Sequence, residues 1–276
     1  MRTLLLRPRH RQDLLTYAVA VLVVPIYLFP ILWLLRASLV TQQELFRISW
    51  TFTPTLRNFG LVFSDLGFAK YVANSLLVTT MATLISMAAG SVAAYGLVRL
   101  DIRGAKWIAY LLLFTRFVPP VAVLVPFFVL ISSLGLYDSH LALILAHISI
   151  LIPYVVFVMY GFFLSIPLEI EQAAIVDGCS MTQVFVRIVL PLAFPGLVAA
   201  TIFAAITSWN DFIYALVITG YHSATWPIFF TQYTGEVTIK WTQIAAGAVI
   251  VAVPVVLLAT AMQKFVTRGL TLGAIK

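Results

Sequence analysis

Apolar residues occur in six long runs along this chain, and short polar segments separate the runs. A helix needs about 20 apolar residues to cross ~30 Å of hydrocarbon, and each run reaches that length. We therefore expect an all-α polytopic membrane protein with about six transmembrane helices in a single domain, residues 1–276. The predicted spans are residues 14–35, 72–98, 107–132, 140–163, 189–218 and 243–265.

Two of these runs have unusual features. The first follows a basic segment, as the core of a signal peptide would, but a signal core has only about 7–15 apolar residues. We therefore predict a retained first span. The fifth run is too long for one straight crossing, and Pro191, Pro195 and Gly196 predict a turn or kink at its start.

The charged residues indicate how the chain is oriented. They make up 10% of the chain, whereas soluble domains have about 25%. The net charge of +7 would suit a nucleic-acid partner, but the basic residues flank spans, as the positive-inside rule requires, and we expect no nucleic acid. With both termini cytoplasmic, eleven Lys and Arg residues lie inside and five outside. This orientation puts residues 165–190 in the cytoplasm and residues 36–71 and 219–242 outside.

The segment from Ser165 to Gly196 is a polar, acid-bearing island between two apolar runs. Pro167 suits the first turn of a helix, because its missing N–H would have no partner there. Two carboxylates, Glu169 and Glu171, follow in that turn, where they favour the positive end of the helix dipole. We expect both acids to be exposed and to offer charge to a basic groove of a partner.

The same island carries signals for a tight turn and a second helix. Gly178 can adopt positive φ and so end the first helix. Ser180-Met-Thr-Gln183 has the pattern of a capping box, which would begin the next helix. The sequence therefore predicts a helix, a glycine turn and another helix within residues 165–190.

The island resembles the EAA loop of ABC importer permeases. The matching residues are Ala173, Ala174, Asp177, Gly178, Ile188, Leu190 and Pro191. Trp209-Asn210-Asp211-Phe212 and the tail Arg268–Lys276 are similar to the carbohydrate-uptake branch, in particular to the maltose-type second permease. There is one departure: the family usually has Glu where this chain has Gln172, which could hydrogen-bond a partner but could not form an ion pair.

This resemblance implies a type I ABC importer permease fold with cytoplasmic coupling helices. It implies the membrane subunit of an ATP-driven, binding-protein-dependent sugar importer in a bacterial or archaeal inner membrane. The chain would be non-catalytic, because it has no Gly-x-x-x-x-Gly-Lys-Ser/Thr motif, and ATP and Mg²⁺ would bind to separate subunits. The implied partners are a second, homologous permease, two cytoplasmic ATPase subunits, an extracytoplasmic sugar-binding protein and the lipid bilayer.

The resemblance also implies roles for particular residues. The residues expected to couple to the ATPases are Glu169, Glu171, Gln172, Ala173, Ala174, Asp177 and Gly178. The tail residues expected to contact the ATPases are Gly269, Leu270, Thr271 and Lys276; the alternative is an ordinary chain end. The aromatic residues expected to contact the binding protein are Tyr221, Trp226, Tyr233 and Trp241; the alternative is an aromatic belt at the membrane interface.

Some residues within the spans have two interpretations at this stage. Arg116, Asn210 and Asp211 would line the translocation path and bond sugar hydroxyls, or Arg116 and Asp211 would make structural contacts, including a mutual ion pair. His147 is expected to be a hydrogen-bonded packing residue. A stripe of small residues in the second span, with Gly90 at its centre, either lines a gate or packs within the chain.

Two other classes of protein fit the sequence less well. An ion-coupled secondary transporter would need buried acidic residues and usually inverted repeats, and the sequence offers only Asp211 and no repeat. A membrane-embedded enzyme would need His, Asp or Ser clustered in one layer, and no such cluster or metal-ligand spacing is present in the sequence.

Overall fold

The computed structural model describes residues 8–47, 51–65, 67–233 and 239–273. Four helices in this part of the chain are long and apolar enough to cross a membrane: α1 (Pro8–Ser38), α4 (Phe68–Arg99), α7 (His140–Leu164) and α14 (Trp241–Gly273). Two bent helix pairs raise the number to six if each is one span. The described residues thus form the all-helical, membrane-type fold that the hydropathy pattern predicts.

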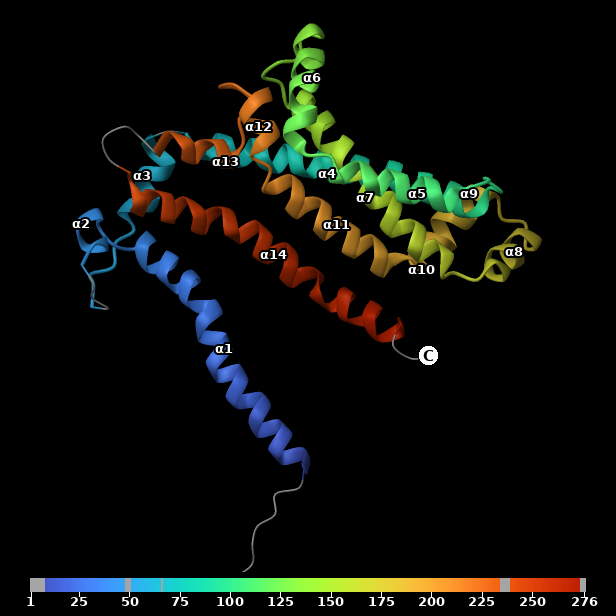
Figure 1. The fold of residues 1–276 in the computed structure, drawn as a ribbon, viewed down its shortest axis with the longest axis horizontal. Coiled ribbons are helices and arrows are strands. Elements are labelled where there is room, and N and C mark those ends of the chain that lie inside the picture. The colour runs from blue at the N-terminus through green and yellow to red at the C-terminus, as the bar shows by residue number, and fades with distance from the viewer. Residues whose placement is uncertain (1–7, 48–50, 66, 234–238, 274–276) are drawn as a thin grey trace, which may run out of the picture. The chain divides into compact units, whose positions relative to one another are not determined.

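Shorter helices connect these long ones (Figure 1). They are α2 (Gln42–Leu45), α3 (Arg57–Asp65), α5 (Ala105–Phe114), α6 (Pro120–Ser133), α8 (Leu168–Val176), α9 (Met181–Val184), α10 (Leu190–Leu192), α11 (Phe194–Trp209), α12 (Ile213–Ile218) and α13 (Trp226–Phe229).

The described chain separates into two compact units. One comprises Met1–Gly67 with Tyr233–Ala252, and the other comprises Phe68–Gln232 with Val253–Lys276. The sequence was expected to form a single domain, and that expectation stays a prediction.

In the larger unit, α4 and α7 pack in parallel, and α11 packs against both in the opposite direction (Figure 1). At one end, Asn74 of α4 lies 2.9 Å from His140 of α7. At the other end, Arg99 of α4 donates to the carbonyl of Phe163 in α7. Because these contacts join like ends of the two helices, we refer below to the Asn74 end and the Arg99 end.

The small residues of α4 let it approach α7 closely. Ala82, Ser86, Gly90 and Ala94 recur every four residues, and all four are buried. A Cβ atom at Gly90 would lie 2.6 Å from Cγ1 of Val155, so a larger residue there would force Val155 to shift. The stripe therefore packs within the chain, which is one of the two interpretations that the sequence left open.

Two of the predicted spans are not single helices. The run 107–132 divides into α5 and α6, which meet at 91°. Pro119 and Pro120 cause this break, since a proline ring cannot continue a helix through its own position. The run 189–218 bends by 77° before Phe194, near the prolines that predicted a kink, and breaks again after Trp209. The predicted kink at the start of this run is confirmed, and the break after Trp209 was not predicted.

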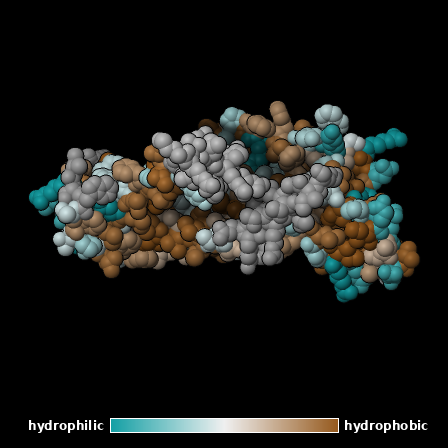
Figure 2. All heavy atoms as spheres, turned by 90° about the horizontal axis from the view of Figure 1, so that it is seen from below, coloured by the Kyte–Doolittle hydropathy of each residue, from teal (hydrophilic) through white to brown (hydrophobic). Residues whose placement is uncertain are grey.

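The smaller unit holds α1 and the segment after it. The Nδ2 atom of Asn58 donates to the carbonyls of Ser38 and Val40, at 2.9 and 2.7 Å, and fixes the chain where α1 ends. Within the most apolar 18-residue window of Val19–Ser38, only 6% of the residues are buried. Hydrophobic residues also cover much of the coloured surface in Figure 2, between hydrophilic patches. An apolar surface this extensive requires lipid or another protein around it.

Candidate functional site

The polar island folds as the helix, turn and helix that its sequence predicts. Gly178 has φ of 91° and ends α8. Its N–H donates to the carbonyl of Ile175, and the N–H of Cys179 donates to the carbonyl of Ala174, both at 3.0 Å. This pair of bonds is a Schellman motif, which satisfies carbonyls at a helix end. We call residues 167–184 the α8 hairpin.

The second half of the α8 hairpin begins with the predicted capping box. The side chain of Ser180 accepts from the backbone of Gln183, and the side chain of Gln183 accepts from the backbone of Ser180. A π-helical segment, Phe185–Val189, then leads into α10. Such segments are rare and often occur at functional positions in helices.

Glu171 contradicts the expectation that both acids of α8 are exposed. Its side chain is 2% exposed and forms an ion pair with Arg99, whose Nη2 atom lies 2.6 Å from Oε1. The hydroxyl of Tyr95 donates to Oε2 at 2.7 Å. Arg99 also donates to the carbonyl of Ile166 at 2.9 Å. Glu171 therefore fastens α8 to the end of α4 and does not offer its charge to a partner.

The other residues of the predicted coupling set divide between two faces. Ala174 is buried beneath α8. The remaining members, Glu169, Gln172, Ala173, Asp177 and Gly178, are exposed. The exposed face thus carries acids and an amide, and a small alanine at Ala173 leaves room for close approach.

Arg116 lies in the short 3-10 turn between α5 and α6. Its guanidinium carbon is 5.9 Å from the ring centre of Tyr154 and 5.6 Å from that of Phe203. These two rings stack with centres 3.9 Å apart. The Nη1 atom is buried and has no hydrogen-bond partner among the described residues. Aromatic faces attract a cation but leave its N–H groups free to bind an acceptor.

Asp211 pairs with His147 and not with Arg116. Its Oδ2 atom is 3.3 Å from Nε2 of His147, although the geometry does not make a hydrogen bond. Nδ1 of His147 is 2.7 Å from the hydroxyl of Ser208, which donates to Thr79. His147 is thus hydrogen-bonded, as expected. Oδ2 of Asp211 also accepts from the N–H of Ala215 at 3.2 Å, in the first turn of α12.

Asn210 bonds within its own helix end. Its Nδ2 atom donates to the carbonyl of Ile206 at 2.9 Å, and its side chain is exposed. The three residues predicted for a translocation path are therefore not gathered into one described pocket.

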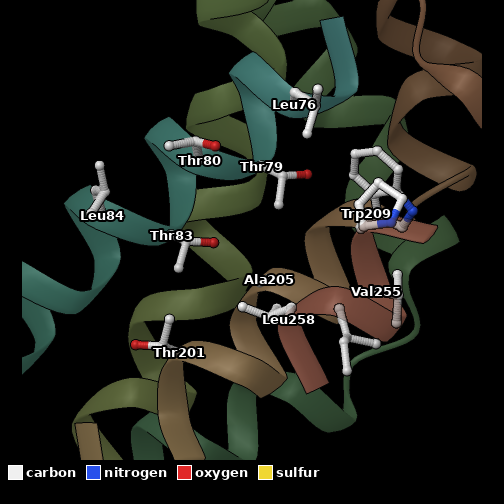
Figure 3. A pocket seen from close by; sticks show the side chains of 12 residues that line it. Leu76, Thr79, Thr80, Thr83, Leu84, Thr201, Ala205, Trp209, Val255 and Leu258 are labelled. Carbon is white, nitrogen blue, oxygen red and sulfur yellow. The ribbon is translucent and has the colours of Figure 1, made fainter. Parts of the chain in front are cut away.

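A separate cavity of about 310 Å³ lies between α4, α11 and the part of α14 after Val253 (Figure 3). Leucines and other apolar side chains form most of its lining, with Trp209 at one side. Four threonines contribute hydroxyls: Thr79, Thr80 and Thr83 from α4 and Thr201 from α11. The hydroxyl of Thr83 is buried and has no hydrogen-bond partner among the described residues. No sequence pattern distinguishes these threonines, because they lie within ordinary apolar runs.

The aromatic residues after α12 differ in exposure. Tyr221 is 73% exposed. Trp226 turns inward, where its ring centre is 6.3 Å from that of Trp209 and 5.7 Å from that of Phe230. Trp241, in the smaller unit, is 48% exposed.

Several predicted positions lie outside the described residues. The side chains of Tyr233, Leu270 and Thr271 are not described, although the backbone of these residues and of Gly269 lies in helical segments. Lys276 lies wholly outside the described residues.

A family model described as the binding-protein-dependent transport system inner membrane component matches residues 86–272. The chain belongs to this family. This match contains the whole α8 hairpin and so confirms that the polar island resembles a segment of ABC importer permeases. The permease is the non-catalytic membrane component of a transport system, as its sequence predicted.

Relatives of this permease include SmoH of Agrobacterium fabrum, a sulfoquinovosyl glycerol transport system permease protein. The two are 35% identical over 253 residues, which cover 90% of this chain and 89% of SmoH. SugB of Mycobacterium tuberculosis, a trehalose transport system permease protein, is 32% identical over 263 residues, or 92% of this chain and 94% of SugB. The predicted resemblance to the carbohydrate branch of ABC permeases is therefore confirmed.

A solved structure confirms the fold class. It is a bacterial ABC transporter involved in the import of the acidic polysaccharide alginate. It matches with a TM-score of 0.76 at 22% identity, covering 95% of this chain and 99% of that chain. The permease thus has the fold of an ABC importer membrane subunit.

Proposed function

We propose that this permease forms half of the translocation pathway of an ATP-driven, binding-protein-dependent sugar importer, and that it works by alternating access. The observation that carries the proposal is the α8 hairpin within a chain of this family. Relatives named for the transport of trehalose and sulfoquinovosyl glycerol support a carbohydrate as substrate. A second, homologous permease would complete the path and cover part of the apolar surface that the chain leaves exposed.

The exposed face of α8 would receive the ATPase subunits. Glu169 and Asp177 offer charge, Gln172 offers a hydrogen bond, and Ala173 permits close approach. ATP and Mg²⁺ would bind to those subunits, and their closure would move α8. Because Glu171 bonds Arg99, movement of α8 would pass directly into α4. The tail residues Gly269, Leu270, Thr271 and Lys276 are proposed as a further ATPase contact.

The charge distribution supports an orientation. The α8 hairpin, the Arg99 end and both termini would face the cytoplasm of a bacterium or archaeon. The Asn74 end would face outward, toward a sugar-binding protein. Tyr221 is the aromatic residue best exposed for that contact, and Trp241 and Tyr233 are proposed as secondary contacts. The ring of Trp226 packs inward against Trp209 and Phe230, which favours a role in supporting the loop and not in contacting the binding protein.

Arg116 is the residue we favour for contact with substrate along the path. Its unpaired Nη1 group beside a stack of two rings matches the chemistry of a sugar, which offers hydroxyl acceptors and apolar ring faces. Asn210 and Asp211 would act just beyond the C-terminal end of α11. Both residues make hydrogen bonds within the chain, which favours a structural role for them along the path.

An import assay tests the proposal. The complex would be reconstituted in sealed vesicles with its ATPases and binding protein, and uptake of a radiolabelled disaccharide such as trehalose would be followed. We expect uptake that requires ATP and survives a protonophore. The binding protein would first be screened against trehalose and other disaccharides by thermal shift, so that the labelled sugar is one it delivers. Uptake that continues without ATP and stops with the protonophore would overturn the proposal.

An ion-coupled secondary transporter is not favoured. The chain belongs to a family of binding-protein-dependent permeases, and its relatives are named as components of such systems.

A further inference from the structure

The loop that joins α12 to α13 is bound to a single carboxylate. Asp138 lies in the turn before α7, in the left-handed region with φ of 55°. Its Oδ1 atom accepts from the N–H of Gly220 at 2.8 Å and from the N–H and hydroxyl of Ser223 at 2.9 and 2.8 Å. Its Oδ2 atom accepts from the N–H of His222 at 3.0 Å. One side chain thus holds three of four consecutive residues.

Gly220 is required for this approach of the loop to Asp138. A Cβ atom at position 220 would lie 2.8 Å from Oδ2 of Asp138, closer than such atoms pack. The backbone of Asp138 also donates to the carbonyl of Ile218 at 3.1 Å. The carboxylate and the backbone of one residue therefore bind both the start and the middle of the loop.

A second side chain holds the loop from α4. The Nδ2 atom of Asn74 donates to the carbonyls of His222 and Ala224, both at 2.9 Å. Its Oδ1 atom lies 2.9 Å from Nε2 of His140, so the amide is itself oriented. Asn74 is buried, with 8% of its surface exposed. Loss of this amide would leave two loop carbonyls without their partner.

The loop held in this way exposes one aromatic ring. Tyr221 lies between the anchored residues Gly220 and His222 but points outward. Nζ of Lys70 donates to the carbonyl of Tyr221 at 3.0 Å and lies 4.0 Å from the centre of its ring. The ring and the ammonium group therefore form one small surface whose backbone is already ordered.

We propose that Asp138 and Asn74 are positioning residues that preset the loop 219–225 for contact with the sugar-binding protein. The proposal rests on the proposed function, which puts this loop on the outer side. Side-chain and loop ordering weakens association, and a loop ordered in advance avoids that loss. Asp138 and Asn74 therefore act on the affinity for the binding protein and not on the ATP-driven step itself.

The test uses the complete complex in nanodiscs, with its ATPases and purified binding protein. ATP hydrolysis is measured against binding-protein concentration, which yields a half-saturating concentration and a maximal rate. We expect Asp138→Ala to raise the half-saturating concentration about tenfold and to keep the maximal rate within about twofold. Asp138→Asn keeps one acceptor oxygen, so its half-saturating concentration should lie between those of the unaltered complex and of Asp138→Ala. The matched control is Asp101→Ala, which removes an exposed aspartate at the Arg99 end and should change neither value.

Tyr221→Ala separates failure of the positioning role from failure of the contact between the loop and the binding protein, and the import assay tests the proposed function independently of both. If Tyr221→Ala leaves the half-saturating concentration unchanged, the proposed contact of the loop with the binding protein is wrong. If Tyr221→Ala raises it but Asp138→Ala behaves like Asp101→Ala, the positioning role is wrong.

A measurement on the unaltered complex covers the case in which Asp138→Ala fails to assemble. Hydrogen exchange without binding protein should show the amides of Gly220, His222 and Ser223 protected at least about tenfold over that of Tyr221. Equal exchange at all four amides would overturn the preset loop.

Discussion

Glu171 of α8 and Arg99 of α4 form a buried ion pair between residues that lie 72 positions apart in the sequence. The pair joins the last residue of a membrane-spanning helix to the helix proposed to meet the ATPase. Arg99 also bonds two carbonyls at the end of α7 and just beyond it, Phe163 and Ile166. One guanidinium thus connects three helices at the Arg99 end.

Removing Glu171 should destabilise the permease more than removing Glu169. In Glu171→Ala, Arg99 loses its counter-charge in a buried place, which costs about 3–5 kcal/mol when a buried pair is broken. Glu169→Ala removes an exposed acid and should change stability by about 0.5 kcal/mol or less. Thermal unfolding of the detergent-purified complex measures both. Equal midpoints for the two variants would contradict a structural role for the ion pair.

Gly178→Val should abolish ATP-dependent import and weaken co-purification of the ATPase subunits. No atom lies within 4 Å of a Cβ placed there, so the penalty comes from the backbone, whose φ is 91°. Left-handed backbone costs about 1–2 kcal/mol for an ordinary residue and more for a β-branched one. Gly161→Ala is the control, because a Cβ there also meets nothing within 4 Å but its φ is not positive. Unchanged import and co-purification in Gly178→Val would refute the role of the turn.

Gly90→Ala should loosen the packing of α4 on α7. The new methyl group would lie 2.6 Å from Cγ1 and 2.9 Å from Cβ of Val155, and such overpacking costs about 1–3 kcal/mol. Adding Val155→Ala should restore part of the lost stability, because it removes the nearer atom. Gly96→Ala is the control, since its Cβ would meet Leu100 at an ordinary 3.6 Å. The thermal midpoint checks each variant, and the absence of rescue by Val155→Ala would argue against this contact.

Titration of Asp138 should make the permease less stable as the pH falls into the acid range. Partial burial acts to raise the pKa of Asp138, but hydrogen bonds from His222, Ser223 and Gly220 outweigh it and lower the pKa from 3.8 to about 2. A lowered pKa in the folded state contributes stability above about pH 4, which is lost as pH falls toward 2. The contribution is at most about 2 kcal/mol.

Asp138→Asn provides the comparison for this pH effect. Because an amide does not titrate, the variant should lose less stability than the unaltered chain between pH 5 and 2, a window chosen to span roughly both pKa values. Chemical denaturation at several pH values measures the difference. Parallel pH profiles for the two proteins would show that Asp138 does not titrate as its hydrogen bonds require.

The parts of this protein that sequence predicted correctly depend on interactions between close neighbours. The turn at Gly178 and the capping box of Ser180 and Gln183 form within a few residues, so their pattern is sufficient to predict them. The long helices follow from apolar runs for the same reason, since each satisfies its backbone groups internally.

The sequence could not show which surface each polar side chain faces. Glu169 and Glu171 are two positions apart and look alike in the sequence, yet one is exposed and the other is buried. The difference comes from Arg99, on a helix distant in the sequence. Asp138 is a similar case, because its partners lie more than 80 residues away.

The amino-acid sequence by itself determined the helical membrane architecture, the local form of the α8 hairpin and the family to which the chain belongs. Only the tertiary structure decided that Glu171 binds Arg99, that Arg116 lies beside two stacked aromatic rings and that Asp138 anchors the loop 219–225. The physical reason is the range of the interactions. Periodicity and turn chemistry act along a few residues, whereas ion pairs, ring contacts and loop anchors depend on how distant helices pack.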